Sequence, residues 1–323
     1  MPFAIRVHEV GGPEKMLWEE VETPRPGPHE VLIRNRAVGL NFIDVYYRNG
    51  LYSDSLPLTP GAEGAGVVEA VGSEVKEFKP GDRVGYAGGL GAYSELVIRP
   101  ASRLARIPAD LDEKTVAAVL LKGMTAEFLI RRTHRVQAGE TILVHAAAGG
   151  VGQILCQWAK HLGARVIGTV GSEEKAALAK QSGCEHVIVS RSGPVSKQVR
   201  ELTEGKGVPV VYDGIGKATF MDSLDCLAPR GLMVSFGNAS GAVEPFPLGI
   251  LAQKGSLYVT RPTLMTYVAQ RDELEKSAHD LFSVIQQGAV KVSINQTYPL
   301  REAARAHRDL EARKTTGSSL LLI

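Results

Sequence analysis

The sequence predicts an α/β protein with two domains, one mostly β and one built on a parallel sheet with helices on both faces. Three observations support this. The first third of the chain has short β-type runs separated by turn residues. Residues 141–260 alternate short apolar runs with helical segments, as in a parallel sheet covered on both faces. A glycine-rich turn joins the first apolar run of that region to its first helix.

Composition limits the classes of function. The chain has 323 residues and a formal net charge of +2, so bulk electrostatics suggests neither a nucleic-acid nor a membrane partner. Its three cysteines lack metal-ligand spacing and are too few for a disulfide framework in a chain of this length. The low number of thiols fits a reducing cytosol and predicts a cytoplasmic protein. The first ten residues read as a strand and not as a signal peptide. No apolar stretch has the length of a membrane span.

The mostly β domain is predicted from short apolar runs bounded by turn residues. The runs are Glu30–Arg34, Gly66–Val71 and Tyr93–Ile98, and turn signals lie at Pro24–Pro28 and Lys79–Asp82.

The second domain is predicted from residues 141–260. Thr141–His145 is a strand, and Gly152–Leu162 is a helix with its apolar residues on one face. Arg165–Val170 is the next strand, followed by the helix Glu173–Gln181. Four further apolar runs are predicted as strands: Val187–Val189, Val208–Tyr212, Leu232–Phe236 and Leu257–Thr260.

The tail of the chain holds two predicted helices and one predicted strand. The helices are Asp272–Gln287 and Arg301–Arg313, and the strand is Ser319–Ile323. A closing strand needs a sheet to join, so we expect it to return to the first domain.

The glycine-rich turn reads Ala146-Ala147-Ala148-Gly149-Gly150-Val151-Gly152. Aligned with the fingerprint GxGxxG, it places Ala147, Gly149 and Gly152 in the three glycine slots. The middle glycine lets a pyrophosphate approach the backbone, and the last lets the helix lie close to the sheet. The helix N-terminus offers N–H groups to the phosphates. The strand before the turn and the helix after it support dinucleotide binding over a turn without a ligand.

The end of the second strand indicates the kind of dinucleotide. An NAD site places Asp or Glu there to bind the ribose hydroxyls. Here the strand ends Thr169-Val170-Gly171-Ser172, and Lys175 follows within one turn. A missing carboxylate beside a cation favours the 2′-phosphate of NADPH, although Glu173 and Glu174 lie close by. The alternative for Lys175 is a solvated helix residue.

At this point a family resemblance is visible. The chain resembles the zeta-crystallin-like quinone oxidoreductases, the zinc-free branch of the medium-chain dehydrogenases and reductases, over nearly its whole length. The resemblance rests on the turn and on eight further segments: His8 to Glu14, Gly39 to Asp44, Gly61 to Val68, Lys79 to Val84, Leu121 to Thr125, Gly231 to Gly241, Lys254 to Pro262 and Thr316 to Leu321.

The same resemblance shows which metal ligands are missing. Zinc alcohol dehydrogenases carry Cys where this chain has Asn41, and a His-Glu pair where it has Ala62-Glu63. Their four-cysteine lobe is replaced by residues 85–90, which contain no cysteine. A catalytic zinc needs about three protein ligands, so the sequence predicts no metal.

Quinones suit a site without a metal, because the oxyanion formed by hydride transfer spreads its charge over the ring. Our catalytic candidates are Asn41, Tyr46 and Tyr52. We expect Asn41 to donate an amide N–H to a quinone oxygen, Tyr46 to pack on the rings and Tyr52 to close the pocket. The alternatives are local backbone contacts for Asn41, and core packing of Phe42 with Tyr46.

The resemblance also implies the residues that bind NADPH. Phe42 and Tyr46 would lie near the nicotinamide, Gly150 and Val151 at the pyrophosphate, and Ser172 with Lys175 at the 2′-phosphate. Further cofactor contacts are expected from Thr125, Ala148, Gly149, Gly171, Ser190, Arg191, Phe236, Gly237, Asn238, Thr260, Arg261, Pro262 and Arg313. Arg313 has the alternative of a solvated helix cation.

Three positions depart from the bacterial pattern of this family. Ser190 and Phe128 each stand where tyrosine is expected, and Gly214 stands where serine is expected. Arg191 could take over phosphate binding beside Ser190.

The resemblance implies a GroES-like catalytic domain of residues 1–122 with 263–323, and a Rossmann domain of residues 123–262. It implies NADPH-dependent quinone reduction and a homodimer formed through the cofactor domain, at Gly231–Phe236 and Ser256–Thr260. A 2-alkenal or enone reductase is the nearest alternative. A crystallin-like or RNA-binding protein without turnover is the alternative from another class.

Overall fold

The computed structural model describes residues 1–323, with the side chain of Ser192 excepted. By packing, the chain divides into two compact units. Unit 1 comprises residues 1–124, 268–282 and 292–323, and unit 2 comprises residues 125–267 and 283–291. The predicted α/β class is confirmed, with one antiparallel-rich unit and one parallel sheet. The predicted domain boundaries remain a prediction.

Unit 1 is built on a seven-stranded sheet, in which six strands follow the order β14-β15-β3-β4-β5-β7 and the seventh, β6, pairs with β3. A two-stranded sheet, β1-β2, completes it. The strands are β1 (Phe3–Val7), β2 (Met16–Glu20), β3 (Glu30–Gly39), β4 (Glu63–Val71), β5 (Arg83–Ala87), β6 (Leu96–Pro100), β7 (Leu104–Arg106), β14 (Ile294–Pro299) and β15 (Ser318–Leu322). The core holds the apolar side chains of the sheet, among them Ile33, Val38, Val84 and Leu104.

Four longer helices accompany these strands. They are α1 (Phe42–Arg48), α2 (Glu113–Phe128), α9 (Arg271–Gln286) and α10 (Ala303–Glu311). α2 continues into a π-helical turn at Leu129–Thr133. The boundary between the units falls within α2, and the last turn of α9 belongs to unit 2.

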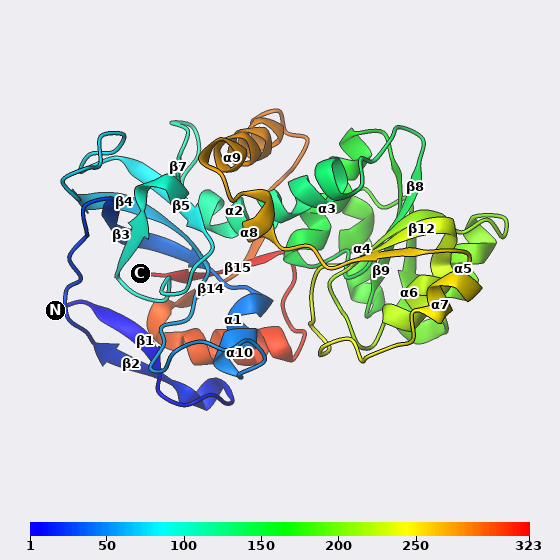
Figure 1. Ribbon diagram of the computed structural model, residues 1–323, viewed down its shortest axis with the longest axis horizontal. Helices are drawn as coiled ribbons and strands as arrows, with labels where there is room; N and C mark the ends of the chain where they lie inside the picture. The colour runs from blue at the N-terminus through cyan, green and yellow to red at the C-terminus, as the bar shows by residue number, and fades with distance from the viewer. The chain divides into compact units, whose positions relative to one another are not determined.

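The last strand returns to the sheet of the first domain, as expected. β15 pairs antiparallel with β3 and parallel with β14. Figure 1 shows β15, red at the end of the chain, among the strands of the N-terminal part. β14 was missed in the sequence because its residues, Ile-Asn-Gln-Thr-Tyr-Pro, are mostly polar. The strand expected at Tyr93–Ile98 begins later, at Leu96.

Unit 2 is one sheet of six parallel strands in the order β10-β9-β8-β11-β12-β13. The strands are β8 (Thr141–Val144), β9 (Arg165–Val170), β10 (His186–Val189), β11 (Val208–Asp213), β12 (Leu227–Ser235) and β13 (Tyr258–Thr260). The helices are α3 (Gly150–His161), α4 (Glu173–Gln181), α5 (Val195–Leu202), α6 (Phe220–Cys226), α7 (Gly249–Gln253) and α8 (Leu264–Tyr267).

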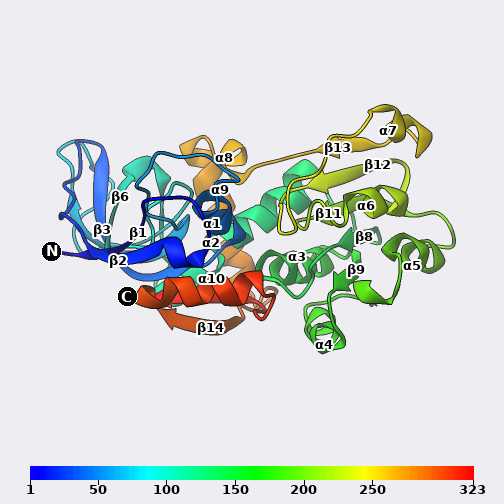
Figure 2. The same cartoon turned by 90° about the horizontal axis from the view of Figure 1, so that it is seen from below.

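The direction of the chain across this sheet changes after β10. β9 and β10 are added in turn on one side of β8, whereas β11 pairs with β8 on its other side. Right-handed crossovers therefore place α3 and α4 on one face and α6 on the other, as Figure 2 shows. A loop at such a switch point is where open α/β sheets bind ligands.

None of the helices in the described part of the chain is long and apolar enough to cross a bilayer.

Candidate functional site

The predicted dinucleotide-binding residues of unit 2 lie in loops that follow its parallel strands. The glycine-rich turn follows β8, Gly171 follows β9, Ser190 follows β10, Phe236 follows β12 and Arg261 follows β13. Because parallel strands all end at the same edge of a sheet, five segments far apart in the sequence meet at one edge. The turn after β8 lies at the switch point between β8 and β11.

The turn after β8 is held closed by backbone bonds. Ala146 has a φ of 53°, in the left-handed region, although it is not glycine. The Ala147 N–H donates to the Thr169 carbonyl at 2.9 Å, and the Gly149 N–H donates to the Ala146 carbonyl at 2.9 Å. A Cβ on Gly152 would lie 2.2 Å from the Ala146 carbonyl oxygen, so only glycine lets α3 begin this close to the turn. The N-terminus of α3 then supplies unpaired N–H groups and the positive end of the helix dipole.

A buried polar network supports this edge from beneath. His145, directly after β8, accepts from or donates to the Thr169 hydroxyl at 2.9 Å and the Ser223 hydroxyl at 3.0 Å. The Ser223 hydroxyl donates to Asp213 Oδ2 at 3.0 Å, and Asp213 Oδ1 accepts the N–H groups of Ile215 and Gly216. Serine lies between histidine and carboxylate, so this is not the order of a nucleophilic triad. The network joins the ends of β8, β9 and β11.

Burial lowers the pKa of His145, so the ring is neutral at the bottom of this edge. The sequence shows no partner for His145, because Thr169 and Ser223 reach it only through the fold.

The end of β9 has the shape expected for a phosphate-binding loop. Gly171 is exposed, and a Cβ added to it would meet no atom within 4 Å. Ser172 is the N-cap of α4 with an extended backbone, and the Lys175 N–H donates to the Ser172 carbonyl at 3.2 Å. Lys175 therefore lies in the first turn of α4, directly after the end of β9.

The three residues that depart from the family pattern, Ser190, Gly214 and Phe128, each lie close to another residue of unit 2. The Ser190 hydroxyl donates to the Val170 carbonyl at 3.2 Å and so ties the end of β10 to the end of β9, while Arg191 is exposed. A Cβ on Gly214 would lie 3.0 Å from the Phe236 ring, which covers it. Phe128 is buried and stacks on Tyr267, with ring centroids 4.4 Å apart.

The loops after β12 and β13 complete the edge. The Phe236 N–H donates to the Asp213 carbonyl at 2.8 Å, which joins the end of β12 to the end of β11. Ser235, just before it, has a buried hydroxyl without a hydrogen-bond partner among the residues that the structure describes. Gly237 and Asn238 follow Phe236, and Thr260, Arg261 and Pro262 lie at and after the end of β13.

Four of the predicted cofactor residues lie elsewhere, and two of them, Phe42 and Tyr46, belong to α1 of unit 1. Thr125 is buried within α2, at the first position of unit 2. Arg313 belongs to unit 1, where it is exposed after α10 with a φ of 59°.

The catalytic candidates of unit 1 gather around α1. Asn41 is the N-cap of α1, and Phe42 and Tyr46 lie within the helix. The ring of Tyr52 meets that of Tyr46 edge-on at 5.3 Å, and the Tyr52 N–H donates to the Tyr46 carbonyl at 2.9 Å. The Phe42 and Tyr46 centroids are 6.4 Å apart. The structure thus places these aromatic candidates side by side on one short helix and the loop after it.

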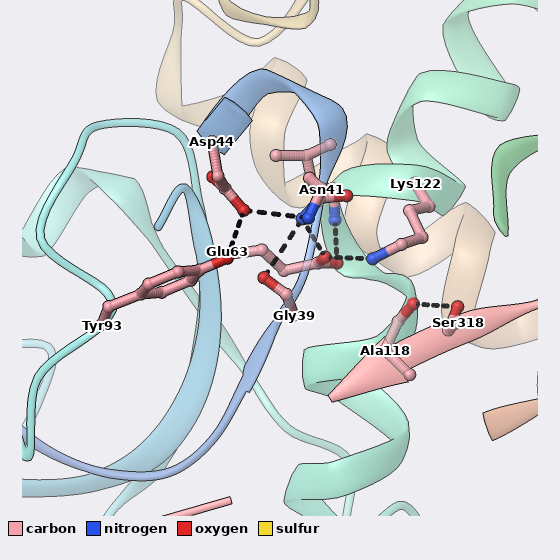
Figure 3. A network of polar contacts seen from close by, with 9 residues as sticks. Gly39, Asn41, Asp44, Glu63, Tyr93, Ala118, Lys122 and Ser318 are labelled. Carbon is pink, nitrogen blue, oxygen red and sulfur yellow. Dashed lines mark hydrogen bonds and ion pairs between the residues drawn. The ribbon is translucent and has the colours of Figure 1, made fainter. Parts of the chain in front are cut away.

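The side chain of Asn41 is engaged within the protein itself. Its amide nitrogen donates to Glu63 Oε2 at 2.9 Å and to the Gly39 carbonyl at 3.3 Å (Figure 3). An amide NH₂ has two hydrogens, so both are already engaged. Donation to a quinone oxygen would require one of these bonds to break. The sequence could not show this, because Glu63 lies 22 positions away on β4.

Zinc does not fit the residues at this position. Ala62 offers no ligand, and Asn41 presents amide hydrogens toward Glu63. The remaining carboxylate, Glu63, is fully buried and accepts from the Lys122 ammonium at 2.6 Å and from the Leu121 N–H at 2.7 Å. A protein cation therefore already neutralises the one carboxylate that a metal would use. Within the described residues, no cluster of three His, Cys, Asp or Glu side chains could hold a metal ion.

Asp44 is the second buried carboxyl group beside Asn41. Its Oδ2 accepts the Asn41 backbone N–H and the Tyr93 hydroxyl, each at 2.9 Å (Figure 3). Burial raises the pKa of Asp44 to about 7, against the lowering effect of these hydrogen bonds and of Lys122, while Glu63 raises it further. The group therefore changes charge near neutral pH.

This titration predicts a pH-dependent stability difference between the wild type and Asp44→Asn. In the unfolded chain an Asp loses its proton near pH 4, whereas folded Asp44 keeps it until about pH 7. The folded state thus binds more protons in this window, so the wild type loses stability relative to Asp44→Asn as the pH rises from 4 to 7. Unfolding of both proteins at several pH values measures the difference. A difference that stays constant with pH would contradict the raised pKa.

Two family models match different parts of this chain. Residues 27–109 match the alcohol dehydrogenase GroES-like domain, and residues 150–283 match the zinc-binding dehydrogenase family. The chain is 56% identical to a quinone oxidoreductase of Pseudomonas aeruginosa, and 46% identical to a 2-haloacrylate reductase of a Burkholderia species, over at least 99% of each chain. The crystal structure of the Escherichia coli quinone oxidoreductase complexed with NADPH matches with a TM-score of 0.98 at 50% identity, covering 99% of this chain and 100% of that one.

Proposed function

This chain belongs to the quinone oxidoreductase family, and from that premise we propose that it reduces quinones with NADPH and without a metal. The observation that carries the proposal is the edge of the unit 2 sheet. There the glycine-rich turn lies at the switch point, and the end of β9 lies beside it. The β9 end has no carboxylate at Gly171 or Ser172, and Lys175 follows in the first turn of α4.

The residues at this edge fit the parts of NADPH. Gly149 to Val151, at the N-terminus of α3, would bind the pyrophosphate through backbone N–H groups. Ser172 and Lys175 would bind the 2′-phosphate. Arg191, the residue after Ser190, would supply a second cation there. Phe236 to Asn238 and Thr260 to Pro262 would line the nicotinamide half. NADPH, when bound, supplies the hydride.

The substrate side is proposed to be formed by Tyr46 and Tyr52. Tyr46 is almost wholly buried and meets Tyr52 edge-on, so both rings are held in place for stacking against a flat quinone. Their hydroxyls are the proposed donors to the quinone oxygen, where the negative charge of the reduced ring develops. Asn41, with its amide hydrogens engaged, is proposed to shape this pocket through Glu63 instead of donating to the substrate.

The metal-free part of the proposal rests on the donor set around Asn41. Lys122 supplies a fixed positive charge to Glu63 at the place where zinc dehydrogenases carry ligands. Delocalisation in the quinol oxyanion removes the need for a Lewis acid.

The assay that tests the function follows the absorbance of NADPH with 1,4-benzoquinone, a bulkier ortho-quinone and a 2-alkenal, each repeated with NADH. We expect quinone-dependent oxidation of NADPH, weak with NADH, and unchanged after dialysis against EDTA. Turnover of the 2-alkenal alone would overturn the quinone assignment. Loss of activity in EDTA that zinc restores would overturn the metal-free assignment.

Reduction of an activated C=C bond is the second candidate. It is favoured by the 46% identical relative named a 2-haloacrylate reductase. It needs the same cofactor and a donor to the carbonyl oxygen, so the 2-alkenal arm of the assay separates the two.

We expect Lys175→Ala to change the choice between cofactors. The loss of one ammonium at the 2′-phosphate should raise the KM for NADPH about tenfold, since charge-assisted hydrogen bonds contribute about 1.5–3 kcal/mol. The KM for NADH should stay within about twofold, because NADH has no phosphate there. A parallel change with both cofactors would show that Lys175 supports the fold and not the phosphate. Lys180→Ala, at the other end of α4, is the matched control.

A homodimer is also proposed, through the edge strand β13. β13 is the last strand of the unit 2 sheet, and Tyr258 on it is 61% exposed. An uncovered edge strand is a natural pairing site. Light scattering of the wild type and of Val259→Pro would test this, since proline removes a backbone donor from the strand. A monomeric wild type would overturn it. A cytoplasmic location remains a prediction.

A further inference from the structure

The short helix α1 is tied at both ends by one connected set of buried hydrogen bonds. At its start, the Asp44 carboxylate accepts from the Asn41 N–H and from the Tyr93 hydroxyl. The Tyr93 hydroxyl lies 3.0 Å from His307 Nε2, and His307 Nδ1 lies 3.3 Å from Arg48 Nη1. Arg48 is the last residue of α1, so the path leaves the helix at Asp44 and returns to it at Arg48.

When Asp44 is ionised, the hydrogens in this path can point in only one direction. An arginine only donates, so His307 Nδ1 must accept from Arg48 and the ring must carry its hydrogen on Nε2. Nε2–H then donates to the Tyr93 oxygen, and the Tyr93 hydroxyl donates its single hydrogen to Asp44. Burial and the charge of Arg48 lower the pKa of His307 to about 3, which agrees with a neutral ring.

Tyr93 and Arg48 are each also held by contacts outside this path. The Tyr93 backbone is bonded to Pro60 and Ile5, and its ring packs so closely on Gly61 that a Cβ there would lie 2.3 Å from it. Arg48 donates to the Gly11 carbonyl at 3.0 Å and forms two hydrogen bonds of 2.8 Å with Glu311 of α10. The path therefore connects α1 to a rigid loop and to α10.

Stability is a weak explanation for this arrangement. Asp44, Tyr93 and His307 are fully buried, and Arg48 is 1% exposed. Replacing buried polar groups by apolar groups of similar volume is often neutral or stabilising. Asp44 Oδ1 is moreover buried without a hydrogen-bond partner among the described residues, which costs stability. What the connected bonds do supply is one defined geometry. Here that geometry belongs to the helix that carries Phe42 and Tyr46.

We propose that Tyr93 and His307 are positioning residues for the reduction, because they hold α1 at both ends and so set the orientation of the Tyr46 ring toward the substrate. The inference rests on the proposed function in one respect, the assignment of Tyr46 to the substrate side. Neither residue touches substrate or cofactor in this proposal. Both act through Asp44 and Arg48.

The first test compares Tyr93→Phe with Tyr86→Phe. Tyr86 is equally buried in unit 1, and its hydroxyl donates to Asn35 Oδ1 at 2.8 Å, away from α1. Each variant removes one buried hydroxyl, so their losses of thermal stability should be similar. We expect kcat to fall at least tenfold in Tyr93→Phe only, with the Kd for NADPH within about threefold of the wild type in both, because most proposed NADPH contacts lie in unit 2.

The second test uses two replacements of His307. Glutamine can keep an N–H near the position of Nε2 and so still donate to Tyr93, whereas asparagine reaches only the position of Nδ1 near Arg48. We expect His307→Gln to retain at least fivefold more kcat than His307→Asn, although both remove the ring.

Two outcomes would overturn the inference: wild-type kcat in Tyr93→Phe, or equal losses of kcat in Tyr93→Phe and Tyr86→Phe. Failure of the proposed function is recognised separately, because the wild type would then not oxidise NADPH with any quinone. In that case, kcat of the same variants is measured with the 2-alkenal as substrate, and the same two outcomes would overturn the inference.

Discussion

Gly152→Ala is expected to abolish tight binding of NADPH while leaving unit 1 folded. The added Cβ would lie 2.2 Å from the Ala146 carbonyl oxygen and 2.9 Å from the Ala147 Cα. Both neighbours are backbone atoms of the turn, so the clash can be relieved only by moving α3 away from the turn, where we propose that the pyrophosphate binds. Forced overpacking of this kind costs about 1–3 kcal/mol, and we expect the Kd for NADPH to rise on the order of 10- to 100-fold.

Fluorescence titration with NADPH measures this effect, and two other glycines calibrate it. A Cβ on Gly149 would lie 3.2 Å from the same oxygen, so Gly149→Ala should give an intermediate loss of affinity. A Cβ on Gly249, the first residue of α7, would meet nothing within 4 Å, so Gly249→Ala should bind NADPH as the wild type does. A Kd for Gly152→Ala within twofold of the wild type would contradict the placement of the cofactor at this turn.

Lys122→Met is expected to cause the largest loss of stability of any single change discussed above. Lys122 and Glu63 are 5% and 0% exposed, and their charged atoms lie 2.6 Å apart. Removing the ammonium leaves a buried carboxylate without a cation, which costs about 3–5 kcal/mol in comparable pairs. Two N–H donors, from Leu121 and Asn41, remain on the carboxylate but carry no full charge.

The double variant Glu63→Gln/Lys122→Met separates the missing charge from the lost packing. It removes both charges, so it should recover most of the stability that Lys122→Met loses. The exposed pair Arg34–Glu69 is the control, with side chains 46% and 36% exposed. Arg34→Met should cost less than about 1 kcal/mol, as exposed ion pairs do. Equal effects of Lys122→Met and Arg34→Met on unfolding by urea would show that the buried pair contributes little.

The Lys122–Glu63 pair also restricts the hydrogen bonds that the Asn41 side chain can make. Glu63 holds one amide hydrogen of Asn41, and Lys122 holds Glu63. In Lys122→Met, Asn41 keeps its bond to Glu63, but Glu63 loses the cation that fixes its position. Reduced kcat in the double variant, at recovered stability, would indicate that the Glu63 charge orients Asn41 for the reduction.

Unit 2 could be predicted closely from the sequence because its signals are local. Each parallel strand is a short apolar run, and the turn after β8 and the helix start at Glu173 lie within a few residues of their strands. Strands of a parallel sheet all point the same way, so residues that follow them meet at one edge once the class is known. The order of the strands and the switch point at β8 were not predicted, because the alternation of strands and helices does not fix which strands are neighbours.

The network around α1 could not be predicted, because its members are distant in sequence and ordinary in their local patterns. Arg48 and His307 lie 259 positions apart, and Tyr93 and Asp44 lie 49 apart. His307 is a histidine within a helix, and nothing nearby in the sequence distinguishes it from an exposed one. The engagement of Asn41 with Glu63 was hidden for the same reason, so the residue was expected to face the substrate.

Local patterns were thus enough to predict the α/β class and the glycine-rich turn, and the family resemblance added the aromatic residues of α1 as candidates. Periodicity, turn chemistry and the missing zinc ligands are all properties of short segments. The partners of the buried polar groups required the folded chain, because antiparallel sheets bring distant segments together and a side chain's hydrogen-bonding capacity does not reveal which partner will use it. The tertiary structure therefore decides which polar atoms remain available to a substrate.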